Sequence, residues 1–317
     1  RMSIDRGTSV HVRAPASLSN LGPGFDAFGL CIEGIADEVF IERTETEGVR
    51  IAGMDGLTDG IPADATNTAA VGAQYVLNRS GLEGGLSLRI RKGIRIGSGI
   101  GGSAASAVAG AVAANEVLGR PLSKDEVIVA GLEAERSAAG AIHGDNVLPC
   151  MLGGFVLTTP GDAMRFRRYE VAADLHIPLL LPEFTVLTEN ARAVLPKMTS
   201  LTDAAVTAAA SAHVVASLLS RDWPALGLAI MNDRLVEPHR AALIGFYSAV
   251  KDAALAAGAL GCALSGSGPA MFAVADTMAS AQAVAEAMLS ALKDLGERGS
   301  SHVVHTSNSG VQVNSSE

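Results

Sequence analysis

A run of glycines and other small residues in the first third of the chain carries the strongest chemical signal. Between Lys92 and Ser106 the sequence reads KGIRIGSGIGGSAAS. Glycines let the main chain approach an anion closely, and the N–H groups and dipole at the start of a following helix favour negative charge. The run therefore predicts a phosphate-binding loop at a nucleotide site. It is not a P-loop, because no Gly-Lys-Ser or Gly-Lys-Thr closes it.

A turn leading into an alanine-rich core helix would give the same run without any ligand, so other motifs must decide. Ser123 and Glu126 fit a capping box, which predicts a helix that continues through Glu135. Glu135 shares the apolar face of this helix and would need a cation. A structural ion pair would supply one. The alternative is Mg²⁺, which takes oxygen ligands and bridges phosphates, held by Glu135 together with Ser103.

Two arginines could clamp a small carboxylate. Arg192 lies in the segment TENARAVLP, and Arg240 lies in NDRLVEPHR. The planar guanidinium group can bind both oxygens of a carboxylate at once. A surface salt bridge would explain either arginine alone. A carboxylate-bearing substrate is the alternative.

Hydrophobic patterning indicates which elements position these residues. Alternating apolar and polar residues over 86–90 predict a strand before the loop. A helix is expected from about Ser103 to Leu118, with Gly119 and Pro121 as stop signals. The glycine loop therefore lies between a strand and a helix.

Two further segments combine a strand with a glycine-bearing turn. Residues 10–26 place a strand before a turn that carries Asn20 and Asp26, and residues 263–274 read as strand, Gly/Ser turn and strand. Three such segments at these relative positions resemble the GHMP small-molecule kinases over nearly the whole chain. Within that superfamily, the details are most similar to the homoserine kinases.

The resemblance implies an α+β fold of the GHMP kinase type. Its N-terminal domain would be like ribosomal protein S5 domain 2, its C-terminal domain would be ferredoxin-like, and the active site would lie in the cleft between them. We expect an ATP-binding domain over 1–165, a C-terminal α+β domain over 166–306 that completes the substrate cleft, and a frayed tail over 307–317. Helices and strands in the second domain are expected at about 202–220, 241–257 and 278–295, and near 178–187 and 262–274.

The resemblance also implies a reaction: transfer of the ATP γ-phosphoryl group to the side-chain hydroxyl of L-homoserine, giving O-phospho-L-homoserine in threonine biosynthesis, with Mg²⁺ as cofactor. Two alternatives stay open. The chain could be another GHMP-type kinase that acts on a different small hydroxyl substrate, or a non-catalytic nucleotide or ligand sensor on the same fold.

By resemblance, one set of residues binds the nucleotide, and Ser103 and Glu135 hold the metal. An Asx turn or helix cap would explain Asn67 as well as an adenine contact does, and Lys92 could be an exposed strand-end cation. Gly102 stands where the family has a serine, so a hydroxyl contact is lost. The expected nucleotide-binding residues are Asn67, Lys92, Gly97, Ser98, Gly99, Ile100, Gly101, Gly102, Ser103 and Ala104.

A second set forms the substrate pocket by resemblance, with the arginines on the carboxylate, and Asn20 and Asp26 on the ammonium. Thr188 would orient the hydroxyl, and Asp26 is either an ammonium ligand or a general base. Gly144 replaces a family proline, which would loosen that turn. The expected substrate residues are Asn20, Asp26, His143, Asp145, Asn146, Thr188, Arg192, Arg240 and Gly266. The expected catalytic residues are Ser103, Glu135, Thr188 and Asn146.

Composition is compatible with such an enzyme. The chain has 317 residues, 48% of them hydrophobic, and a formal net charge of −9, which argues against nucleic acid or a membrane surface as a partner. The three cysteines (Cys31, Cys150 and Cys262) have no metal-ligand spacing and predict reduced thiols in the cytoplasm. No apolar run is expected to span a membrane. A homodimer is plausible by resemblance.

Overall fold

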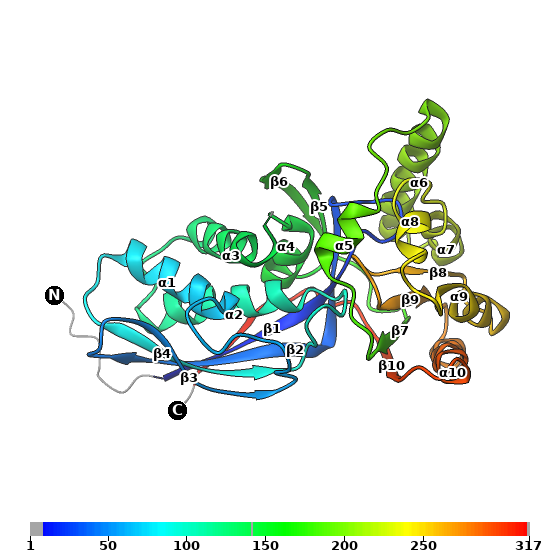
Figure 1. The fold of residues 1–317 in the computed structure, drawn as a ribbon. Coiled ribbons are helices and arrows are strands. Elements are labelled where there is room, and N and C mark those ends of the chain that lie inside the picture. Colours follow the sequence, from blue (N-terminus) through cyan, green and yellow to red (C-terminus); the bar gives the residue numbers. More distant parts are fainter. Residues whose placement is uncertain (1–8, 141, 316–317) are drawn as a thin grey trace.

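The structure, a computed structural model, describes residues 9–140 and 142–315 and contains two β-sheets, one toward each end of the molecule (Figure 1). The first sheet has seven strands. Its main path runs β11-β1-β2-β4-β3, and β5 pairs with β2 and β6. Only β3 and β4 pair in parallel. The bounds are β1 Ser9–Ser19, β2 Phe28–Thr44, β3 Gly48–Gly56, β4 Gly85–Lys92, β5 Phe155–Thr159, β6 Asp162–Tyr169 and β11 Gln312–Ser315.

Four helices cover one face of this sheet (Figure 1). They are α1 Thr68–Ser80, α2 Gly102–Val117, α3 Lys124–Ala139 and α4 Gly144–Leu152. The small residues of α2 let it pack closely against α1, since a Cβ atom at Gly110 would lie 2.0 Å from the carbonyl oxygen of Ala69. The predicted strand at 86–90 lies within β4, and the predicted helices begin as expected, α3 with its capping box at Ser123.

The second sheet is antiparallel in the order β10-β7-β9-β8. Helices α9 and α10 bury Val250, Val284 and Met288 in its core cluster. Its strands are β7 Ile177–Pro182, β8 Gly261–Leu264, β9 Met271–Val274 and β10 Gly299–Val304. The accompanying helices are α5 Thr188–Ala193, α6 Leu201–Ser220, α7 Trp223–Ile230, α8 Glu237–Ala241, α9 Tyr247–Ala256 and α10 Met278–Asp294.

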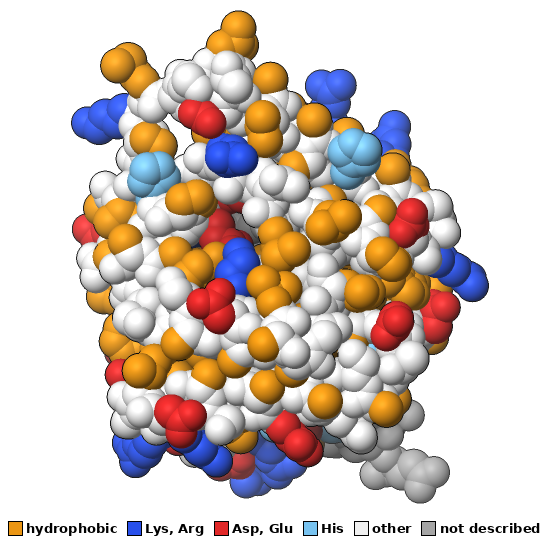
Figure 2. Space-filling view, turned by 90° about the vertical axis from the view of Figure 1, so that its right-hand side faces the viewer, with side chains coloured by type: hydrophobic (Ala, Val, Ile, Leu, Met, Phe, Trp, Pro, Cys, Tyr) orange, Lys and Arg blue, Asp and Glu red, His pale blue; other side chains and the backbone are white. Residues whose placement is uncertain are grey.

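The outer face of this half of the molecule carries scattered hydrophobic side chains and a hollow that holds acidic and basic side chains together (Figure 2). A cavity of about 450 Å³ between α8 and α9 is lined by Glu237, Tyr247 and Lys251, among others. Glu237 accepts hydrogen bonds from the side chains of both Tyr247 and Lys251 and, at 3.0 Å, from the backbone N–H of Leu264. This network fixes the end of β8, just before the Gly/Ser turn.

Three details differ from the expectations. The frayed tail is wrong for residues 312–315, because β11 pairs with β1 and supplies hydrogen-bond partners to a strand that would otherwise be an edge. The expected domain boundary at 165 falls inside β6, which pairs with β5. The helix expected over 241–257 begins only at Tyr247, and a separate short helix, α8, precedes it.

Within the described residues, α6 is the one helix long and apolar enough to cross a membrane, although no such segment was expected. Its mean hydropathy is 1.3, and 28% of the apolar window is buried. Length and composition alone also admit core helices. Val214 and Leu218 of α6 are buried in the main hydrophobic core.

Candidate active site

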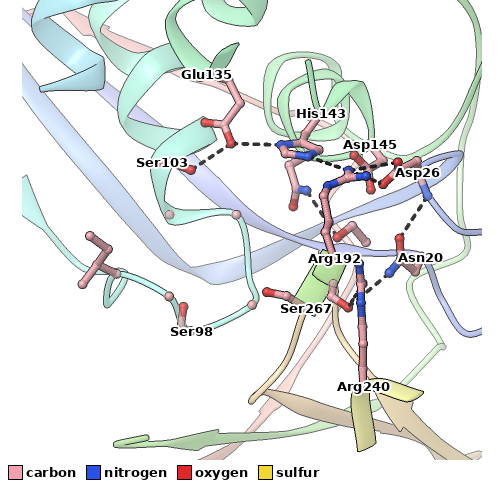
Figure 3. Close-up of a pocket in the computed structure, with 18 residues that line it drawn as sticks. Asn20, Asp26, Ser98, Ser103, Glu135, His143, Asp145, Arg192, Arg240 and Ser267 are labelled. Atoms are coloured by element: carbon pink, nitrogen blue, oxygen red, sulfur yellow. Dashed lines mark hydrogen bonds and ion pairs between the residues drawn. The ribbon is translucent and has the colours of Figure 1, made fainter. Parts of the chain in front are cut away.

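A cavity of about 120 Å³ brings together segments that are distant in the sequence (Figure 3). Its walls come from the turn after β1, the glycine loop before α2, the end of α3, the start of α4, the helices α5 and α8, and the Gly/Ser turn after β8. The two halves of the molecule therefore both contribute to one site.

Glycines at alternate positions give the loop its shape. Gly97, Gly99 and Gly101 have φ of 64°, 86° and 73°, in the left-handed region that side chains disfavour. A Cβ atom at Gly101 would lie 2.5 Å from Oγ of Ser17, and one at Gly99 would lie 2.6 Å from the carbonyl oxygen of Ser265. Other residues at these two positions would displace the loop from β1 and from the Gly/Ser turn.

The carbonyl groups of the loop accept hydrogen bonds from neighbouring segments of the chain. The carbonyl of Ser98 accepts from the N–H of Ala270 at 3.0 Å, and that of Ile100 accepts from the N–H of Ser17 at 3.2 Å. The carbonyl of Gly99 accepts from Oγ of Ser265 at 2.7 Å. By contrast, no backbone N–H over 99–103 donates a hydrogen bond to any residue in the described ranges. These free donors, at the N-terminus of the 16-residue helix α2, form a cradle for an anion.

Gly102 has a packing reason for departing from the family serine. A Cβ atom there would lie 2.9 Å from Cγ2 of Ile94, which is fully buried. Gly144 similarly opens α4, where a Cβ atom would lie 2.9 Å from that of Ala163. Both glycines therefore fit close contacts in this chain.

The first residues of α2 and the end of α3 meet in a polar contact. Oγ of Ser103 donates to Oε1 of Glu135 at 2.9 Å, and Nδ1 of His143 lies 3.7 Å from the same oxygen. Glu135 is only 4% exposed, and its Oε2 atom has no hydrogen-bond partner among the described residues. An unpaired carboxylate oxygen buried beside an anion cradle requires a cation or a proton.

His143 joins this contact to Arg192, whose Nη2 lies 2.8 Å from its Nε2 atom. Burial lowers the pKa of His143, but the nearby carboxylates of Glu135 and Asp145 outweigh burial and raise the pKa overall. Because guanidinium nitrogens only donate, the contact fits an imidazole whose proton is on Nδ1. His143 therefore connects the Glu135 contact with the arginine side of the cavity.

Arg192 and Asp26 form an ion pair across the cavity. Nη2 of Arg192 donates to both carboxylate oxygens of Asp26, at 3.1 and 3.0 Å, whereas its Nε atom is buried and has no partner in the part of the chain that the structure describes. Asp26 has φ of 55°, and its backbone N–H donates to Oδ1 of Asn20 at 3.2 Å. Figure 3 shows the continuous chain of contacts from Ser103 through Glu135, His143, Arg192 and Asp26 to Asn20.

Arg240 is held by backbone carbonyl groups. It is 4% exposed and donates to the carbonyl of Gly266 at 2.7 Å and to that of Ala191 at 3.3 Å. Nδ2 of Asn20 donates to the same Gly266 carbonyl at 3.1 Å. Burial, helped by the charge of Arg192, lowers the pKa of Arg240, while nearby carboxylates oppose the shift.

Asp145 and Asn146 complete the polar wall. Burial, reinforced by the charge of Asp26, raises the pKa of Asp145 to about 7. Asn146 is fixed by β1, since it accepts from Oγ of Ser17 at 3.1 Å and donates to Oγ of Ser19 at 3.3 Å. Both side chains line the cavity.

Lys92, expected to contact phosphate, does not line the cavity. The side chain is buried and forms an ion pair with Asp37, and it also donates to Oγ of Ser106 at 2.7 Å. Asp37 accepts the N–H groups of Gly93 and Ile94 at 3.0 and 3.1 Å. Lys92 therefore anchors the base of the glycine loop, where the strand alternation places it inside rather than at the strand's exposed end.

Two other expected residues lie apart from the cavity or outside the description. Asn67 is the N-cap of α1: its Oδ1 accepts from the N–H of Ala69 at 3.0 Å, and its Nδ2 donates to the carbonyl of Pro62 at 2.8 Å. That geometry favours the helix-cap interpretation over an adenine contact. Thr188 begins α5, but its side chain lies outside the described residues.

Sequence reasoning missed three contributors. Asp37 and Glu237 brace the loop and the Gly/Ser turn, and both are buried acids whose partners are distant in the sequence. Phe25 lies beneath both arginines, with its ring centroid 5.6 Å from Cζ of Arg192 and 5.1 Å from Cζ of Arg240. Its position between Gly24 and the candidate residue Asp26 was the available signal for this aromatic side chain.

Comparisons with known proteins agree with this arrangement. Residues 67–154 match the family model of the GHMP kinases N terminal domain, and residues 214–294 match that of the GHMP kinases C terminal. The chain is 37% identical over 288 residues to the homoserine kinase of Pyrococcus abyssi, covering 90% of this chain and 94% of the relative. It is 40% identical over 295 residues to that of Arabidopsis thaliana, covering 91% and 80%.

A solved structure is similar along the whole length. The crystal structure of homoserine kinase from Cytophaga hutchinsonii superimposes with a TM-score of 0.92 at 36% identity, covering 99% of each chain. The expected α+β fold, with its N- and C-terminal GHMP kinase domains, is thereby confirmed. The chain belongs to the GHMP kinases and, within them, to the homoserine kinase family.

Proposed function

We propose that this protein phosphorylates the side-chain hydroxyl of L-homoserine with ATP, giving O-phospho-L-homoserine and ADP, the reaction that provides for threonine biosynthesis. One observation carries the proposal. The anion cradle at the start of α2 and a pair of arginines suited to a carboxylate face the same small cavity. A kinase for a small amino acid needs these two features close together, because one bound substrate molecule must reach both of them.

The glycine loop would bind the phosphates of ATP. Its free N–H groups and the dipole of α2 supply positive potential without a lysine. Oγ of Ser98 is buried at the cavity, has no partner within residues 9–140 and 142–315, and is available to a phosphate oxygen. We include Gly97, Ile100 and Ala104 in this site as the backbone that shapes the loop.

Ser103 and Glu135 fit a magnesium site. Oε2 of Glu135 is buried without a partner among the described residues, and Oγ of Ser103 is adjacent to Oε1, so two oxygen ligands face the cradle. Mg²⁺ usually keeps several waters and phosphate oxygens as its other ligands. Bound there, Mg²⁺ would neutralise charge on the transferred phosphoryl group.

Substrate binding would replace the ion pair between Arg192 and Asp26 with contacts to homoserine. In the structure Arg192 and Asp26 neutralise each other. Homoserine carries both a carboxylate and an ammonium group, so it can separate the pair, with its carboxylate taken by Arg192 and Arg240 and its ammonium by Asp26, Asn20 and Asp145. We expect the carbonyl of Gly266 to hold Arg240 and Asn20 in place during this exchange.

The chemical step would depend mainly on positioning. Phosphoryl transfer passes through a loose transition state that needs alignment and charge stabilisation more than a base. Thr188 and Asn146 are the proposed groups that orient the hydroxyl, and its proton would pass to a phosphate oxygen. His143 would fix the position of Arg192 relative to Glu135.

Turnover with several alcohols tests the proposal. ADP release is measured with ATP and Mg²⁺ in the presence of L-homoserine, shikimate or mevalonate, and the product is identified by ³¹P NMR. We expect saturable turnover with homoserine alone. Preferred turnover of another alcohol would indicate a different GHMP-type kinase. Nucleotide binding without turnover would indicate a sensor, against which the Ser103–Glu135 contact argues.

Cellular context is also part of the proposal. All three cysteines (Cys31, Cys150 and Cys262) are buried free thiols, which supports a reducing, cytoplasmic location. We expect no nucleic-acid or membrane partner for a chain with a net charge of −9. A homodimer stays a prediction, which light scattering at several protein concentrations would test.

A further inference from the structure

We propose that Phe25 is a positioning residue that holds Arg192 and Arg240 as one carboxylate clamp, using the π face of its ring. The inference rests on the proposed homoserine kinase activity. It adds a role for a residue that contacts both arginines of the proposed clamp.

The first step is electrostatic. Two guanidinium groups that lie close together repel each other, and Arg240 is almost fully buried, where that repulsion is less screened. Both groups contact the ring of Phe25, at 5.6 and 5.1 Å from Cζ to centroid. Each distance is within the range of a favourable cation–π contact. One ring therefore attracts two cations that repel each other.

The second step concerns the exchange of partners. When the substrate takes over Asp26, Arg192 loses the carboxylate to which its Nη2 atom donates. Arg240 keeps its two backbone carbonyls throughout. The ring of Phe25 and Nε2 of His143 are contacts of Arg192 that do not depend on an acidic partner, and the ring also contacts Arg240. Phe25 can therefore hold Arg192 beside Arg240 in both states of the pocket.

The third step is the rigidity of the turn that carries Phe25. On one side, the N–H groups of Ala27 and Phe28 donate to the carbonyl of Gly24, both at 3.0 Å. On the other, the N–H of Asp26 donates to Asn20, and Asp26 adopts the left-handed conformation that non-glycine residues rarely take. A Cβ atom at Gly24 would lie 2.1 Å from the ring of Phe28, so the turn is also closely packed. The ring is thus presented by a fixed segment.

Phe25→Leu removes the π face and retains an apolar side chain. We expect the KM for L-homoserine to rise about 5- to 30-fold, the combined effect of two lost cation–π contacts, with the KM for ATP within twofold. Phe25→Tyr keeps the π face and should restore the KM for homoserine to within about threefold of the unmodified chain.

Phe40 offers a matched control. It is also half-buried, and Cζ of Arg91 lies 5.7 Å from its ring centroid. Arg91 does not line the cavity, whereas both arginines that contact Phe25 do. Phe40→Leu should leave both KM values unchanged. Circular dichroism and Tm confirm folding of every variant, and Phe25→Met replaces Phe25→Leu if the latter does not fold.

Three results would overturn the role of Phe25: equal effects of Phe25→Leu on both KM values, an effect no larger than that of Phe40→Leu, or failure of Phe25→Tyr to rescue. Each would point to packing rather than to the π face. Absence of homoserine turnover by the unmodified chain would overturn the proposed function itself, and the clamp with it. The two failures are therefore distinguishable.

Discussion

Two side chains at this site each carry a buried polar atom that has no hydrogen-bond partner in the described part of the chain. Oε2 of Glu135 and Nε of Arg192 are both buried without a partner among the described residues. Unpaired buried polar atoms are costly, so proteins keep them chiefly where a ligand completes them. These two atoms are at opposite ends of the contact chain through His143.

Glu135→Gln tests the proposed metal role. The substitution keeps the shape and the contact with Ser103 but removes the negative charge. We expect circular dichroism to stay native, while kcat falls by about 100-fold or more and the Mg²⁺ concentration for half-maximal activity rises. Unchanged activity at saturating Mg²⁺ would show that Glu135 is not a metal ligand. Glu133→Gln, on the same helix but paired with Arg136, is the control.

Asp26→Asn separates an ammonium ligand from a general base. If Asp26 holds the ammonium, the variant keeps an oxygen acceptor and loses charge, so homoserine binds more weakly and the rate at saturation falls modestly. Loss of a base costs about 10²–10⁴-fold in the chemical step. Single-turnover rates at saturating homoserine and MgATP measure that step. A fall of that size with homoserine affinity preserved would make Asp26 the base.

The pKa of Asp145 predicts a pH dependence. Burial raises this pKa to about 7, so in the free enzyme the carboxyl becomes an anion, able to attract an ammonium group, only as the pH passes neutrality. We expect kcat/KM for homoserine to rise with pH through about 7, and Asp145→Asn to flatten that rise. The contribution of Asp145 to the free energy of unfolding should fall as the pH rises from about 4 to 7, because the folded state binds one more proton than the unfolded state in this range. A rise that persists in Asp145→Asn would assign it to another group.

At the scale of elements, the sequence predicted what depends on local pattern. The glycine loop between β4 and α2, the capping box of α3 and the strands around the Gly/Ser turn follow from residue spacing alone. The ion pair of Lys92 was not predicted, because its partner, Asp37, is 55 residues away on β2. A contact between strands that are distant in the sequence cannot be recognised from the residues next to either partner.

Lys92→Met should therefore affect stability more than nucleotide binding. The variant leaves Asp37 buried without its cation, which typically costs about 3–5 kcal/mol. We expect urea denaturation to show a loss of that order, with the KM for ATP of the folded fraction within threefold. Lys124→Met, at an exposed helix start, is the control and should be neutral. A large rise in the KM for ATP with little loss of stability would indicate that Lys92 contacts phosphate.

At the scale of the whole molecule, the active site depends on an arrangement that no single segment specifies. The turn after β1, the start of α2 and the turn after β8 converge on one cavity, although Asn20 and Gly266 are 246 residues apart. Resemblance to a family predicted this convergence, whereas the patterning of the residues did not. The pairing of β11 with β1 was missed because a four-residue polar strand resembles a tail.

Removing residues 311–317 should destabilise the first sheet. The chain would lose β11, and the polar groups of β1 opposite Val313 would face water. We expect the free energy of unfolding to fall on the order of 2 kcal/mol, from the lost ladder hydrogen bonds, with a lower Tm in calorimetry. Val313→Ala keeps the backbone and should cost much less. Equal stability of the shortened and full chains would mean that β11 contributes little.

The pairing of β11 with β1 has a consequence for synthesis on the ribosome. Val12 is made about 300 residues before Val313, its partner in the ladder. At typical synthesis rates of 5–20 residues per second, roughly 15–60 seconds separate them. Throughout that interval the outer edge of β1, the strand that leads into the substrate turn, is open to other chains. A nascent-chain chaperone would have its greatest effect on the yield of this protein during that window.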